Sequence, residues 1–185
     1  MNLPPIPPLE GLHPIVVHFP IGILLIAWIP MLIALIDKKR RHTWFASAAM
    51  LLIVGTIGAF AAVFTGEATE DIVGESSQLI HDAIHEHEEA AELARNLFIA
   101  ATIVFLVVWG VGAKINEKKR MMVGIAGGAL VVASYSVACV SLMNAGHLGG
   151  ELVHIHGIHA PIGSSSTPSA SLSTPRLIEH EDDDD

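Results

Sequence analysis

The sequence predicts an all-α integral membrane protein that folds as an antiparallel bundle of four transmembrane helices. Three observations predict this fold class. The 185 residues are 51% hydrophobic, with a mean hydropathy of +0.54, which is too apolar for an ordinary soluble domain. Four runs without a charged residue cover residues 15–36, 43–65, 96–113 and 121–144. Most basic residues lie in two short segments, between the first and second runs and between the third and fourth.

Each run has the length of a membrane-spanning helix. The runs are about 18 to 24 residues long, and an α-helix needs roughly 20 residues to cross the hydrocarbon layer. The alternative is that they are buried helices of a soluble core, but so short a chain has no surface left to cover four such helices. No basic n-region or small-residue cleavage site precedes the first run. We therefore expect the first run to be a retained helix rather than a cleaved signal.

The first and third helices have recognisable features of their own. The first should begin at His13-Pro14, since proline suits the first helical turn, and Pro20 and Pro30 inside it predict a kink or a widened turn. The stretch "ESSQLIHDAIHEHEEAAELAR" before the third run has apolar residues at helical spacing. It predicts one long helix from about Ser76 to Ile115, whose first third stands clear of the bilayer.

The second and fourth runs are rich in glycine and alanine. Such residues let membrane helices approach closely, and they also leave room for a flat ligand. Both interpretations stay open, and close packing is favoured.

The chain divides into three parts by composition. Residues 1–13 form a Pro-rich arm, residues 14–159 the four-helix membrane domain, and residues 160–185 a low-complexity acidic tail. The tail cannot bury enough apolar surface to fold alone, so we expect a neighbouring subunit to order it.

The basic residues predict the orientation. Eight of the ten Lys and Arg residues lie in the segments 38–41 and 114–120, and short basic loops stay in the cytoplasm. We expect a multi-pass protein of the bacterial inner (plasma) membrane, with both termini on the outer, periplasmic side. The net charge of −9 argues against nucleic acid as a partner. The single cysteine and the lack of a C-x-x-C-H motif exclude covalent c-type haem.

Histidine is concentrated on the predicted outer side. Ten of the eleven histidines lie there, in three groups and the tail. Because the outer ends of the first, third and fourth helices should converge, these groups are expected to meet. His18 lies about one turn inside an apolar run, where an ionisable side chain is costly and usually marks a site. His147 precedes Gly149 and Gly150, which allow the backbone to approach a bulky group closely. The stretch "HEHEE" does not match the H-E-x-x-H zinc-protease motif.

Two stretches carry a family resemblance. "HPIVVHFPIGILL" and "GHLGGELVHIHG" resemble the opening and the close of the membrane family called domain of unknown function 2231, over roughly residues 12 to 160. Some relatives occur beside or fused to c-type cytochromes and have a histidine before the double glycine, as His147 is here. That resemblance implies a b-type haem. His154 stands where the family usually has an aromatic residue, and it adds a possible ligand. The family's motif positions in this chain are His13, Pro14, His18, Phe19, Pro20, Thr65, Gly66, Gly149, Gly150, His156 and Gly157.

The leading functional hypothesis is a membrane-anchored, b-type cytochrome-like subunit. One or two non-covalent haem b groups would be held by imidazoles from different helices. Electrons would pass between a quinol pool and an outer redox partner, such as a c-type cytochrome or another membrane subunit. Such a protein is an electron-transfer subunit rather than an enzyme on its own. Against the hypothesis, no histidine pair lies at matched depth on two helices inside the membrane. The candidate haem-binding residues are His18, His87 and His147, then His156 and His85, then His13, His154, Gly149 and Gly150.

Two other function classes remain. Imidazoles and carboxylates also suit a divalent zinc, copper or iron ion, whose ligands would be His18, His87, His147 and His156. Transport of that ion would need a polar path across the membrane, and the runs offer few polar residues. The third possibility is a structural subunit that braces a larger membrane complex.

Overall fold

The computed structural model describes residues 11–73, 78–114 and 117–158. The described chain is built from helices, in the order α1 (His13–Val16), α2 (His18–Ile26), α3 (Trp28–Ile36), α4 (Arg41–Val73), α5 (Gln78–Lys114) and α6 (Glu117–His154). Four stretches of the described residues are long and apolar enough to cross a membrane: His13–Ile36, Arg41–Ala68, Gln78–Gly112 and Met122–His154. The predicted fold class is therefore confirmed. Most of the arm, residues 1–10, lies outside the described residues. Residues 159–185, which include the whole tail, also lie outside them.

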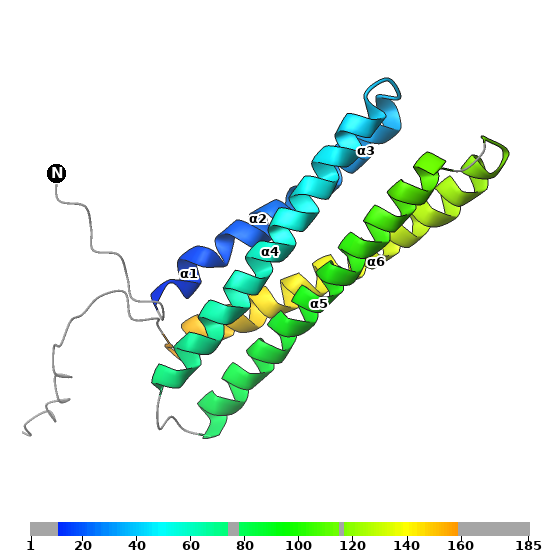
Figure 1. Ribbon diagram of the computed structural model, residues 1–185. Helices are drawn as coiled ribbons and strands as arrows, with labels where there is room; N and C mark the ends of the chain where they lie inside the picture. Colours follow the sequence, from blue (N-terminus) through cyan, green and yellow to red (C-terminus); the bar gives the residue numbers. More distant parts are fainter. Residues whose placement is uncertain (1–10, 74–77, 115–116, 159–185) are drawn as a thin grey trace, which may run out of the picture.

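The helices form two antiparallel hairpins that lie side by side (Figure 1). In the first hairpin α1, α2 and α3 pack against α4, and in the second α5 packs against α6. The hairpins meet through α4 with α5 and α2 with α6. One end of the bundle, here named the basic end, carries the segment 37–40 between α3 and α4. The opposite end, here named the histidine end, is formed by the start of α1, the end of α4, the start of α5 and the end of α6.

The first apolar run is interrupted twice. Helix α1 gives way to α2 at Val17, and α2 gives way to α3 at Ala27. Each break lies three residues before a proline, Pro20 or Pro30. Proline has no N–H, so the carbonyl four residues earlier loses its helical partner and the turn between them loosens. At the second break the N–H of Ala27 donates to the Leu24 carbonyl at 3.3 Å, a tighter i to i+3 turn. The first run is thus interrupted near each of the two prolines that predicted a kink or a widened turn.

The other helices are longer than the apolar runs. Helix α5 is the single long helix predicted from the sequence, although Ser76 and Ile115 themselves lie outside the described residues. Helix α4 continues past Gly66, and α6 continues past Gly149. Neither glycine therefore ends its helix. A glycine inside a helix costs only about 1 kcal/mol relative to alanine, and helix backbone remains satisfied beyond the hydrocarbon layer.

The interior is made by small residues that receive larger ones. A Cβ added at Gly55 of α4 would lie 2.7 Å from Leu24 Cγ, and one at Gly127 of α6 would lie 2.6 Å from Val108 Cγ1. Close helix approach is thus the role of these two glycines. A buried hydrogen bond of 3.1 Å between the hydroxyls of Thr56 and Thr102 joins α4 to α5. The glycine contacts close each hairpin on itself, and the threonine pair joins the two hairpins in the apolar part of the bundle.

Candidate functional site

Two imidazoles from different hairpins meet at the histidine end. His13 begins α1, and His87 lies in the third turn of α5. Their ring centroids are 6.4 Å apart and their planes are 80° from parallel. Both residues are half-buried. They are separated by 74 positions in the sequence, so only the packing of the two hairpins brings them together.

Both imidazoles are oriented by a backbone carbonyl of the neighbouring helix. His13 Nδ1 donates to the Ala62 carbonyl at 3.0 Å, and His87 Nδ1 donates to the Ala145 carbonyl at 3.0 Å. The hydroxyl of Thr65 lies 3.3 Å from His13 Nδ1 and also hydrogen-bonds to the Ala62 carbonyl. Because a carbonyl only accepts, Nδ1 carries the proton, and in the neutral ring Nε2 keeps its lone pair. Metal-bound histidines are usually oriented in this way through their second nitrogen.

His18 does not belong to this pair. Its Nδ1 donates to the Pro14 carbonyl, four residues earlier in the chain, and the side chain is exposed. The His18 side chain therefore lies on the outer surface of the helix bundle and does not reach the two rings. The reason is rotational: five residues turn a helix by about 140° beyond one full turn. When His13 faces α4, His18 must face outward.

His147 and His85 are also outside the pair. The His147 side chain is 72% exposed, with Nε2 3.4 Å from Glu151 Oε1 on the next turn. The His85 side chain is 61% exposed and lies 3.4 Å from Glu89. His154 is exposed and His156 is half-buried near the end of the described chain. None of these four approaches the two facing rings.

The predicted convergence of three histidine groups is therefore correct for two of them. The group after the fourth apolar run contributes a carbonyl and a glycine to the site instead of an imidazole. Ala145 and Gly149 are four residues apart and share the face of α6 that meets His87, whereas His147 lies about 200° around the helix from Ala145. Gly150 has open space where a Cβ would be, so it does not contact the rings. Among the described residues, no group of three or more His, Cys, Asp or Glu is placed to hold a metal ion.

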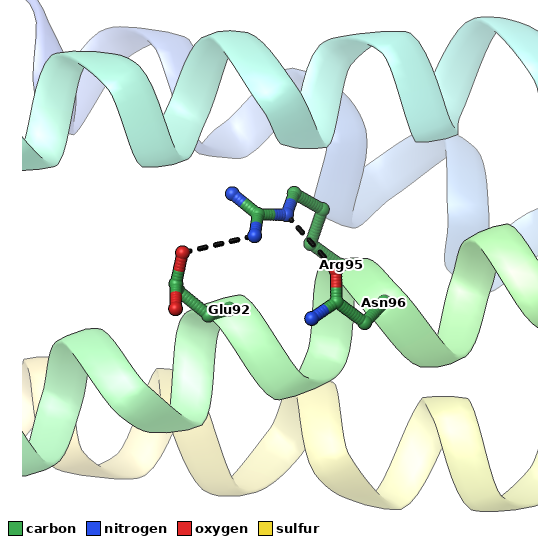
Figure 2. Close-up of polar contacts among 3 residues, drawn as sticks. All are labelled: Glu92, Arg95 and Asn96. Carbon is green, nitrogen blue, oxygen red and sulfur yellow. Dashed lines mark hydrogen bonds and ion pairs between the residues drawn. The ribbon is translucent and has the colours of Figure 1, made fainter.

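A charged cluster lies about two turns of α5 further into the bundle, and sequence reasoning did not single it out. Figure 2 shows Arg95 between its neighbours on α5, with Nη2 2.9 Å from Glu92 Oε1 and Nε 3.3 Å from Asn96 Oδ1. The guanidinium also lies 5.3 Å from the ring centroid of Phe60 on α4, a cation–π contact between the hairpins. The Arg95 side chain is only 17% exposed. The available signal was that Arg95 is one of two basic residues outside the basic segments.

Comparison with known proteins adds one match. A family model described as "Predicted membrane protein (DUF2231)" matches residues 10–161. No curated protein and no solved structure matches the chain. The matched region contains both hairpins and both facing imidazoles.

Proposed function

The chain belongs to the DUF2231 family of predicted membrane proteins, and we propose that it is a membrane-anchored, b-type cytochrome-like subunit whose haem iron is bound by His13 and His87. One observation carries this proposal. Two imidazoles from different hairpins meet in an edge-on contact with their Nδ1 atoms held by backbone carbonyls, which leaves both Nε2 atoms for coordination.

The donor set fits a haem iron. Imidazole side chains are common ligands of haem iron, and His13 and His87 would supply them from two different hairpins. Their ring centroids are 6.4 Å apart, close enough for both rings to hold the same group. Two histidines of one helix face, such as His81 and His85, do not come from different hairpins.

The same observation favours haem over a divalent cation held by protein ligands alone. A zinc or copper ion usually takes three or four protein donors, and the described residues offer no group of three. A porphyrin supplies four of the six iron ligands, so two imidazoles are sufficient. His18, His147 and His156 have no role as ligands in this proposal.

The chain's own residues would orient and shield the group. Haem supplies one-electron transfer when bound. The Ala62 and Ala145 carbonyls fix the ring orientation and raise the basicity of each Nε2. The half-buried position of the two rings at the end of the bundle limits the access of water.

The positive charge of the basic end supports a cytoplasmic position for it. The site, at the opposite end of the bundle, would then be periplasmic. Lys38, Lys39 and Arg40 are exposed at the basic end. We place the protein in a bacterial inner membrane, where the site would exchange electrons with a quinol pool and an outer redox partner. The exposed acidic residues Glu67, Asp82 and Glu86 near the site support a partner with a basic surface.

The test is a visible absorption spectrum of the purified protein, with haem supplied during expression. Wild type should show a low-spin spectrum, His13→Ala and His87→Ala should each abolish it or convert it to high spin, and His81→Ala should leave it unchanged. Loss of the spectrum in His18→Ala or His147→Ala, with both proposed ligand variants normal, would overturn the assignment. A wild type that never binds haem but binds zinc or copper would support the divalent-metal alternative instead.

A further inference from the structure

The two hairpins hold their imidazoles in the same way. In each hairpin the histidine comes from the first helix, α1 or α5. The carbonyl that accepts from Nδ1 comes from the last helix, α4 or α6. A glycine follows that carbonyl by four residues: Gly66 follows Ala62, and Gly149 follows Ala145. A Cβ at Gly66 would lie 3.1 Å from His13 Cε1, and a Cβ at Gly149 would lie 2.9 Å from His87 Cε1.

Helix geometry explains why glycine occupies both positions. In an α-helix the carbonyl of residue i accepts from the N–H of residue i+4, so each carbonyl used by an imidazole belongs to the turn that the glycine closes. A carbonyl oxygen has a second lone pair that can accept from a side chain. The ring reaches this lone pair only by lying on the Cα of the glycine. A methyl group at Gly149, 2.9 Å from His87 Cε1, would force that ring to shift, and one at Gly66, 3.1 Å from His13 Cε1, would require a displacement of a few tenths of an ångström.

We infer that Gly66 and Gly149 are positioning residues that keep the Nε2 atoms of His13 and His87 free and their ring planes near perpendicular. Each glycine, together with the carbonyl four residues before it, forms the surface on which one imidazole lies, and these two surfaces are here named the seats. The inference rests on the proposed function only in naming iron as the atom that Nε2 binds. Neither glycine touches the iron in this arrangement; each acts through its imidazole. Loss of such an orienting contact typically weakens metal binding by about 10- to 100-fold.

The first experiment needs no haem and tests the seats themselves. It is a double-mutant cycle on the midpoint of thermal unfolding of the apoprotein in detergent. Gly149→Ala should lower the midpoint when His87 is present and should not lower it in the His87→Ala background, where the ring is gone. Gly66→Ala should behave in the same way with His13→Ala. Equal lowering in both backgrounds would overturn the seats, because the added methyl would then clash with something else.

The second experiment tests positioning. The rate of haem transfer to apomyoglobin should rise about 10- to 100-fold in Gly66→Ala and Gly149→Ala, with a changed low-spin electron paramagnetic resonance signal. Gly146→Ala is the matched control, because it lies on the same helix with no atom near its added Cβ, and it should leave both unchanged. A coupled stability cycle with unchanged haem transfer would overturn the positioning role. If wild type binds no haem, the proposed function fails, and the stability cycle still decides whether the seats exist.

Discussion

The packing of α5 on α6 can be tested with one substitution at two adjacent positions, Gly127→Ala and Gly128→Ala. A Cβ at Gly127 would lie 2.6 Å from Val108 Cγ1 and 3.2 Å from Val108 Cγ2, whereas a Cβ at Gly128 would meet no atom within 4 Å. Valine has one strongly preferred side-chain rotamer in a helix, so its methyl groups cannot turn away. The two helices must separate locally to admit the alanine at 127.

The magnitudes follow from two opposing terms. Replacing glycine by alanine in a helix gains up to about 1 kcal/mol of intrinsic helix stability at either position. Forcing a methyl group into a packed interior costs about 1–3 kcal/mol, and only Gly127→Ala has this cost. Gly128→Ala should therefore be neutral or slightly stabilising. The difference between the two variants, about 1–3 kcal/mol, isolates the packing term.

The assay is equilibrium unfolding in mixed micelles, followed by circular dichroism as the fraction of denaturing detergent rises. The two variants share the same helix, chemistry and depth to within one residue, so membrane solvation cancels in the comparison. If Gly127→Ala is as stable as Gly128→Ala, then α5 and α6 do not approach as described. His87 and Ala145 lie on the same two helices, so that result would also remove the basis of the hydrogen bond between them.

Three further predictions concern the angle between the two imidazoles, the orientation in the membrane and the pKa of Asp37. Ring planes 80° apart should give a strongly anisotropic low-spin signal in electron paramagnetic resonance of the haem-loaded protein, and a signal typical of parallel imidazoles would exclude this pair as ligands. In whole cells, a membrane-impermeant thiol reagent should label a cysteine placed at His81 and not one placed at Lys39; the opposite pattern would reverse the proposed orientation. The indole N–H of Trp44 donates to Asp37 and lowers the pKa of that carboxyl, with a smaller contribution from the Arg40 backbone. The lowered pKa of Asp37 stabilises the fold above the unfolded-state pKa of this carboxyl, and the stabilisation is lost as the pH falls through the lower folded value. Trp44→Phe should therefore raise the pKa of Asp37 measured by NMR and make unfolding less sensitive to acid.

Much of the fold was predictable because the membrane leaves few solutions. A chain in hydrocarbon must satisfy its backbone hydrogen bonds within each segment, so long apolar runs become helices. Pro20 and Pro30 also predicted the interruptions of the first span, because the missing N–H of a proline removes a hydrogen bond within its own helix. The helix ends were less predictable. Helices α4 and α6 continue well beyond their apolar runs, because hydropathy reports the hydrocarbon boundary and not the end of the hydrogen-bonded backbone.

The histidine end was predicted as a region but not in its detail. The sequence indicates the depth of each histidine along its helix, and depth correctly brought His13 and His87 to one end. It does not indicate which face of the helix meets a neighbour, since that depends on how the hairpins pack. His18 and His147 were ranked above His13 on depth and neighbouring glycines, yet both side chains are exposed. The signal for His87 was its early position in a helix that continues into the membrane.

The site and the apolar interior are built by one packing rule, and this explains how imidazoles are accommodated without disturbing the spans. In each hairpin a side chain from the first half of the hairpin (α1 and α2, or α5) lies on a glycine of the second half (α4 or α6). In the interior these pairs are Leu24 on Gly55 and Val108 on Gly127, and at the histidine end they are His13 on Gly66 and His87 on Gly149. An imidazole in the hydrocarbon would be costly. At the end of the bundle the glycine turn exposes a carbonyl that satisfies Nδ1, so the helix approach that packs aliphatic side chains deeper down orients a coordinating side chain there.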